Sequence, residues 1–92
     1  MEGQKILNSL AMEVKEKLVA KYGSLQIYYN NIIELNKSYY KAFLTHDEQM
    51  KARYEKLRFD YTHELKTWGV IDGLDVFDAI AGDGDENIFW GK

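Results

Sequence analysis

The chain has 92 residues, no Cys, no Pro and a formal net charge of −3. Hydrophobic residues make up 46% and charged residues 29%, which is typical of one small folded domain and excludes a disordered or collagen-like chain. The lack of cysteine excludes a disulfide framework, a thiol nucleophile and a cysteine-ligated zinc site. No apolar run approaches the ~18 residues of a membrane-spanning helix, and the N-terminal residues lack a secretory pattern, so we expect a cytoplasmic protein.

Residues 4–22 carry apolar side chains at spacings of three and four, which predicts a first amphipathic helix. The residues of this stripe are Leu7, Leu10, Ala11, Val14, Leu18 and Tyr22. Gly23 marks the helix end, and Ser24 can cap the helix that follows.

Residues 24–68 contain neither Gly nor Pro and are predicted to be helical throughout. The sequence Thr45-His46-Asp47-Glu48 has the form of a capping box, which favours two helices, 24–44 and 46–68. The alternative is one helix of about 65 Å, because the apolar stripe stays in phase through His46. The break is favoured, since a 45-residue helix is far above the usual length.

Gly69 is predicted to end the third helix, and Asp72 to cap a short fourth helix over residues 73–81. Gly82 and Gly84 then predict a loose acidic tail that ends in aromatic residues. The expected fold is all-α: a helical hairpin or three-helix bundle, with a short C-terminal helix, in a single domain. Residues 1–69 would form the helical body, and residues 70–92 an acidic C-terminal segment.

No catalytic or metal-binding constellation is present. Asp60 precedes His63 by three residues, but a di-metal helix bundle needs two such pairs and further carboxylates. The glycines near the C-terminus follow no strand and lie among acids. A phosphate-binding loop instead follows a strand and presents backbone amides and a Lys. We therefore expect no cofactor, no metal and no enzymatic activity.

Tyrosine is unusually frequent, with seven residues in 92. Tyrosines on the apolar stripes suit core packing with the hydroxyl at the surface, or alternatively a contact surface. Four apolar residues fall off the stripes and indicate a surface for a partner or for homodimerisation: Met12, Val19, Ile27 and Phe59.

The acidic end is the sharpest feature of the sequence, because residues 70–92 hold six acids and one base. A protein partner with a basic surface, such as a nucleic-acid-handling protein with a basic cleft, would bind there through charge and large aromatics, the charge imitating nucleic acid. The predicted partner-binding residues are Asp72, Asp75, Asp78, Asp83, Asp85, Glu86, Phe89, Trp90 and Phe59. The rival hypothesis is that Phe89 and Trp90 fold back and complete the core.

The sequence thus favours a small protein-binding module, either an inhibitor or an adaptor. Its short, cysteine-free composition, rich in Tyr, Asn and Lys, is similar to that of many small phage or mobile-element proteins. The alternative function is nucleic-acid binding through basic residues interleaved with tyrosine. The residues predicted for that alternative are Lys37, Lys41, Lys51, Arg53, Lys56 and Arg58.

Overall fold

The computed structural model describes residues 2–90, with side chains described for residues 2–84. The described residues are 86% helix and contain no strand, which confirms the all-α prediction. The five helices are α1 (Glu2–Asn8), α2 (Met12–Tyr22), α3 (Leu25–Thr45), α4 (Glu48–Thr67) and α5 (Gly73–Trp90).

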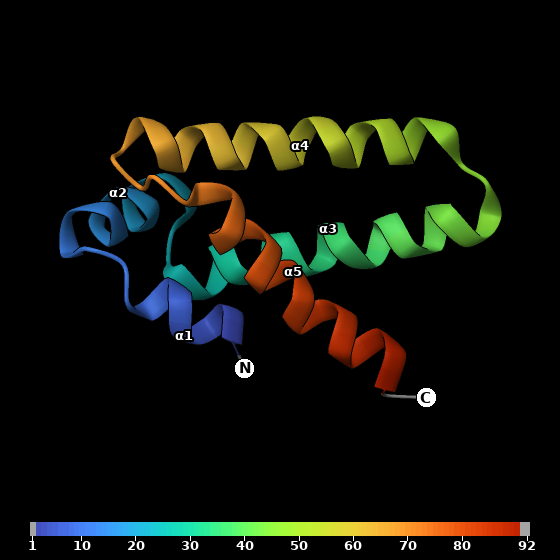
Figure 1. Ribbon diagram of the computed structural model, residues 1–92, viewed down its shortest axis with the longest axis horizontal. Helices are drawn as coiled ribbons and strands as arrows, with labels where there is room; N and C mark the ends of the chain where they lie inside the picture. The colour runs from blue at the N-terminus through green and yellow to red at the C-terminus, as the bar shows by residue number, and fades with distance from the viewer. Residues whose placement is uncertain (1, 91–92) are drawn as a thin grey trace.

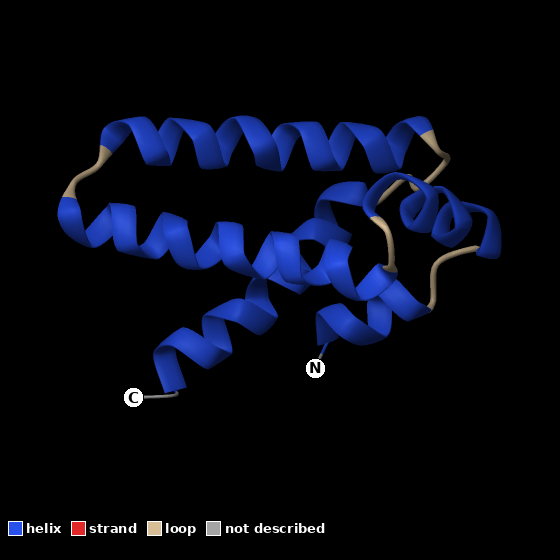
Figure 2. Cartoon of the chain, turned by 180° about the vertical axis from the view of Figure 1, so that it is seen from behind, coloured by secondary structure: helices blue, strands red, loops and turns tan. Residues whose placement is uncertain are grey.

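The two longest helices, α3 and α4, form an antiparallel hairpin, and α5 crosses it and packs against both (Figure 1). The short helix α1 packs mainly on α5, whereas α2 packs on α3. Seen from behind, α1 and α2 both lie at the end of the hairpin opposite the α3–α4 loop (Figure 2). No helix among the described residues is both long and apolar enough to cross a membrane.

The core lies where α5 meets the hairpin and α1. Its fully enclosed side chains come from all five helices: Leu7, Leu18, Tyr28, Ile32, Leu65, Phe77 and Ile80. A row of aromatic rings continues through it, with ring centroids 5.0 Å apart for Tyr22 and Tyr28 and 4.2 Å apart for Tyr39 and Tyr54. Most of the tyrosines therefore serve the core, as one of the two interpretations predicted.

The break between α3 and α4 is confirmed, but its cap is one that the sequence did not indicate. Thr45 is the last residue of α3, and its hydroxyl donates to the carbonyl of Lys41 at 2.9 Å. His46 takes the left-handed conformation (φ 60°) usually given to glycine, and Asp47 accepts from the backbone N–H of Met50 at 3.1 Å. The predicted Thr45 cap was therefore wrong by two residues.

The single helix predicted over residues 4–22 is two helices with a turn at residues 9–11. Ser9 donates its hydroxyl to the carbonyl of Ile6 at 2.7 Å, a local bond that competes with helix propagation. The two halves also have different partners, because α1 is drawn onto α5 and α2 onto α3. The apolar stripe is continuous in sequence but is divided between two packing surfaces.

The C-terminal helix begins at Gly73 as expected, but it continues through Gly82 and Gly84 to Trp90. Glycine at position 84 allows a close approach rather than a break: a Cβ there would lie 3.3 Å from Nδ2 of Asn36 on α3. That Nδ2 also donates to the carbonyl of Ala81 at 3.0 Å. Packing against α3 thus outweighs the low helix propensity of the two glycines, and the predicted loose tail is wrong for the backbone up to residue 90.

Candidate functional site

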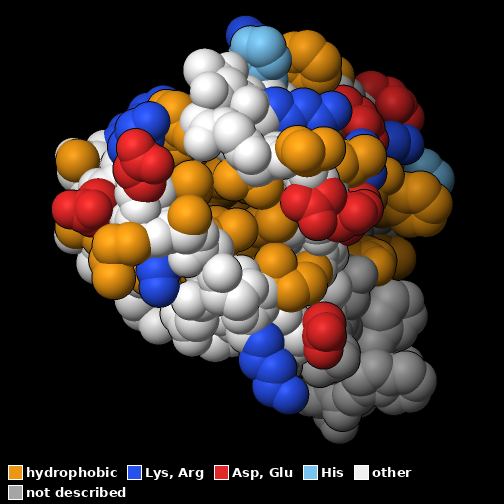
Figure 3. Space-filling view, turned by 60° about the vertical axis from the view of Figure 1, so that its left-hand side comes forward, with side chains coloured by type: hydrophobic (Ala, Val, Ile, Leu, Met, Phe, Trp, Pro, Cys, Tyr) orange, Lys and Arg blue, Asp and Glu red, His pale blue; other side chains and the backbone are white. Residues whose placement is uncertain are grey.

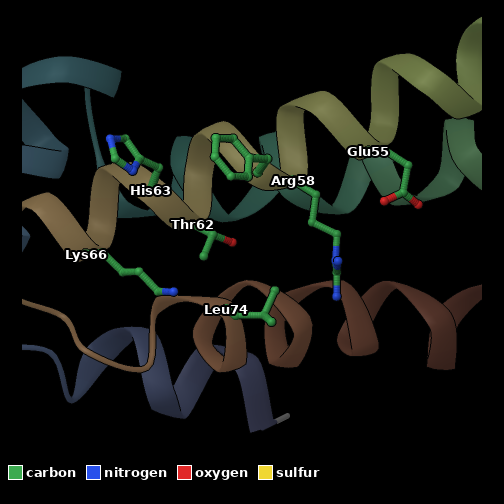
Figure 4. A pocket seen from close by; sticks show the side chains of 7 residues that line it. Glu55, Arg58, Thr62, His63, Lys66 and Leu74 are labelled. Atoms are coloured by element: carbon green, nitrogen blue, oxygen red, sulfur yellow. The ribbon is translucent and has the colours of Figure 1, made fainter.

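A groove of about 390 Å³ lies between α4 and the first turns of α5. Its walls combine apolar, cationic and hydroxyl side chains: Glu55, Arg58, Phe59, Thr62, His63, Lys66 and Leu74. In Figure 4, Arg58 and Lys66 extend from α4 toward α5, and Leu74 points from α5 toward α4. Because both walls are helices, the groove is a preformed surface rather than a loop that must be ordered.

Phe59 is the main apolar side chain of this groove. It lies off the core stripe of α4, and 68% of it is exposed, as its sequence position predicted. Its ring is parallel to the imidazole of His63, with 4° between the planes and 5.9 Å between the centroids. The His63 neighbour orients Phe59 without covering it.

Two apolar residues near the start of α5 are exposed, and one of them, Leu74, lines the groove. Leu74 lies at helical spacing from Phe77 and Ala81, but it is 38% exposed while those two are buried. Ile71, in the turn before α5, is 90% exposed. Leu74 thus adds apolar surface to the α5 wall of the groove, which its helical spacing from Phe77 did not indicate.

At one end of the groove the two helices approach very closely. A Cβ at Gly73 would lie 2.9 Å from the carbonyl oxygen of Thr62 and 3.0 Å from Cβ of Leu65. The hydroxyl of Thr62 is buried there and has no hydrogen-bond partner among the described residues. The floor of the groove at this point is therefore closed by backbone contact.

Asp78 joins the two helices through an ion pair with Arg58, while its side chain stays 47% exposed. Nε and Nη2 of Arg58 each donate to one of its carboxylate oxygens at 3.1 Å. The paired carboxylate also raises the pKa of the Arg58 guanidinium. Of the predicted acidic ridge, this residue is thus engaged within the chain.

Asp72 and Asp75 are exposed, and neither pairs with a basic side chain in the part of the chain that the structure describes. Asp75 directly follows Leu74 on α5, and Asp72 directly precedes the first residue of the helix. Both carboxylates therefore lie at the surface as expected, and their role in binding a partner stays a prediction.

The prediction that Asp83 binds a partner at the surface is wrong, because this residue is only 1% exposed. It accepts from the backbone N–H of Gly3 at 3.1 Å, from that of Gln4 at 3.0 Å and from the hydroxyl of Tyr29 at 2.6 Å. The side chain thus caps the N-terminus of α1 from a distant helix. Once α5 continues past residue 81, position 83 shares the inward face of Val76 and Ile80, which explains the burial.

The remaining predicted partner-binding residues are Asp85, Glu86, Phe89 and Trp90. Their backbone belongs to α5, but their side chains lie outside the described residues. The choice between core packing and docking for Phe89 and Trp90 stays a prediction.

The basic residues predicted for nucleic-acid binding divide into two groups. Lys37 lies 3.5 Å from Glu34, Lys51 lies 3.1 Å from Glu48, and Arg58 is held by Asp78. The other three are exposed and form no ion pair with a described side chain: Lys41, Arg53 and Lys56. Half of the predicted cationic set is thus neutralised locally.

A polar link on the other side of α4 holds α2. Tyr22 donates its hydroxyl to Glu64 at 2.7 Å, and Lys21 forms an ion pair with the same carboxylate. Burial, and then the bond to Glu64, raises the pKa of Tyr22 well above its usual value of 10.0. Tyr22 therefore stays protonated near neutral pH and serves as a structural group rather than as an acid–base catalyst.

Within the described residues, no group of three or more His, Asp or Glu side chains is arranged to hold a metal ion. Comparison with protein-family models, with curated proteins and with solved structures found no match for this chain. The function of the α4–α5 groove is therefore inferred from the chemistry of the residues that line it.

Proposed function

We propose that this chain is a small non-enzymatic protein-binding module, an inhibitor or adaptor, that binds its partner through the α4–α5 groove. The observation that supports this is the exposure of Phe59 in a preformed groove that the partly exposed Leu74 also lines. Exposed large apolar side chains that cluster in one concave region are typical of contact surfaces.

The charges around the groove define the chemistry of the partner. Lys66 lines the groove from α4, and the exposed Asp75 follows the groove residue Leu74 on α5. An amphipathic helix with an apolar ridge, bases along one flank and acids along the other would match this arrangement. The charges would set the orientation of that helix, and Phe59 would supply most of the binding energy.

Imitation of nucleic acid by the acidic segment has weaker support than docking of a helix. Four aspartates of this segment have described side chains, and of these Asp78 is paired with Arg58 and Asp83 is buried. Among the described side chains of the segment, Asp72 and Asp75 remain as exposed carboxylates without an ion pair, and two such groups do not form a ridge.

The test places a photo-crosslinking amino acid at position 59 of the full chain, with position 44 as the control. Leu44 is 78% exposed at the far end of α3, so it matches Phe59 in chemistry but not in location. We expect a protein from the native host to crosslink at position 59 only. Equal crosslinking at both positions would contradict the proposal.

The crosslinked protein is then purified and its affinity measured with three variants. We expect Phe59→Ala to weaken binding about 30-fold, as for a central aromatic contact, and Leu44→Ala to leave it unchanged. The double variant Asp72→Asn with Asp75→Asn should slow association and reduce its dependence on salt. Unchanged affinity for Phe59→Ala would reject the groove as the binding surface.

The second candidate function is nucleic-acid binding, and the observation that favours it is the exposure of three unpaired cations, Lys41, Arg53 and Lys56. A gel shift with DNA and RNA tests it. Binding that weakens steeply with salt and is lost when the three are changed to Glu would support this function over the first.

A further inference from the structure

Helix α2 has two apolar faces, and only one of them is used by the fold. Val14 and Leu18 are buried against the hairpin, at 5% and 0% exposure. Met12 and Val19 lie seven residues apart on another face, two helical turns along, and are 67% and 43% exposed. The second face therefore has no partner within the described chain.

The exposed face of α2 borders a shallow groove of about 500 Å³. The residues that line it are Met12, Lys15, Glu16, Val19, Ala20 and Leu25. Figure 3 views the end of the molecule at which α2 lies, and hydrophobic side chains gather there with charged ones around them. The groove thus contains two charged residues of opposite sign, adjacent in sequence and midway between Met12 and Val19.

Neither of these charges is satisfied by an opposite charge in the described chain. Lys15 donates to the backbone carbonyl of Asn8 at 3.0 Å, and Glu16 makes no ion pair with a described side chain. Along this face the order is apolar, base, acid, apolar. When a second copy lies antiparallel, each base therefore meets an acid and each apolar residue meets an apolar one.

We propose that the exposed α2 face binds a second copy of the chain, with the two α2 helices antiparallel about a two-fold axis that passes between Lys15 and Glu16. Met12 of each copy then faces Val19 of the other, and Lys15 faces Glu16 of the other. Such an isologous contact uses the same patch twice and closes after two copies. This inference is independent of the proposed partner groove, which lies on α4 and α5.

The expected dimer is weak. An 11-residue helix offers a contact below the size of standard protein interfaces, so association should depend strongly on protein concentration. Sedimentation equilibrium of the full chain at concentrations up to about 1 mM should show a monomer–dimer equilibrium.

The test is a charge swap. Lys15→Glu alone, or Glu16→Lys alone, places like charges opposite one another, and the two-fold axis repeats each clash. Two exposed charge clashes should weaken the dimer about 10-fold. The double variant Lys15→Glu with Glu16→Lys restores both pairs and should dimerise within about threefold of the natural chain.

Two controls separate this proposal from a general effect of charge. Lys56→Glu changes an exposed α4 residue and should leave the dimer unchanged, and circular dichroism should show equal helix content in every variant. A monomer at all concentrations, or a double variant as weak as the single ones, would overturn the proposal. Loss of the dimer in Phe59→Ala would place the contact on the α4–α5 groove and would overturn it as well.

Discussion

The two sides of α5 show how differently one acidic, glycine-containing segment can be used. On the side toward α1 and α3, Asp83 is buried with three donors, and glycines allow the helices to touch. On the side toward the α4 groove, Asp75 and Leu74 face solvent. The same residue types therefore fix the fold on one side and are free for a partner on the other, and only position on the helix distinguishes them.

The largest effect is expected for Gly3→Ala, which disrupts the contact between α1 and the inner side of α5. The added Cβ would lie 2.4 Å from Cα of Ile80 and 2.6 Å from the carbonyl oxygen of Ala79, so α1 must move off α5. We expect the free energy of unfolding, measured in urea, to fall by about 3 kcal/mol.

The matched control for Gly3→Ala is Gly82→Ala, because a Cβ at position 82 would meet nothing within 4 Å. This change should instead stabilise α5 by about 0.5–1 kcal/mol through helix propensity. Equal effects at the two glycines would show that the α1–α5 contact is not tight.

Asp83→Ala removes the buried carboxylate on the inner side of α5. Two backbone N–H groups and the hydroxyl of Tyr29 then lose their acceptor. We expect a loss of about 2–3 kcal/mol in the free energy of unfolding. Asp75→Asn, on the outer side, should change it by less than about 0.5 kcal/mol. Comparable losses in urea unfolding would remove the distinction between the two sides.

High pH should lower the free energy of unfolding through the inner side of the molecule, because the core there is rich in tyrosine. Burial raises the pKa of Tyr28, Tyr22 and Tyr61 above the usual 10.0. The folded state therefore keeps protons that the unfolded state loses, so their stabilising effect is complete below pH 10 and declines as the pH rises above it.

Tyr28 alone should lower the free energy of unfolding by about 1.4 kcal/mol for each pH unit above 10, and the other two act in the same sense. Absorbance of tyrosinate during a pH titration checks this prediction. Ionisation of all seven tyrosines near pH 10, without unfolding, would contradict it.

The smallest effect is expected for Tyr28, whose buried hydroxyl has no hydrogen-bond partner in the described part of the chain. Tyr28→Phe keeps the ring contacts with Tyr22 and Tyr61. We expect the free energy of unfolding to rise by about 1 kcal/mol, because an uncompensated polar group leaves the core. Thermal melting at pH 7 measures it, and a clear destabilisation would mean that the hydroxyl has a partner.

The sequence predicted the fold class, the start of α5, the helix ends at Gly23 and Gly69, and the exposure of Phe59, because each depends on local spacing or on one terminating residue. It failed where tertiary contact overrides a local signal. Gly84 reads as a helix breaker, but it lies against Asn36. Likewise, the stripe from Leu7 to Leu18 reads as one helix, but its halves pack on different helices.

The candidate site could be predicted only in part. Asp72 and Asp75 are exposed as expected, since they follow the polar face of a helix whose start was predicted correctly. The burial of Asp83 could not be foreseen, because it depends on a helix that continues beyond its predicted end and on a contact with Gly3, 80 residues away in the sequence.

That long separation has a consequence for the order of folding. The α3–α4 hairpin joins neighbouring segments and can form early, whereas α1 lacks its binding surface until position 83 has been synthesised. At about 5–20 residues per second, α1 would wait roughly 4–16 s on the ribosome for the carboxylate that caps it. The first helix of the chain is therefore expected to be among the last to dock, and its docking closes the longest loop in the molecule.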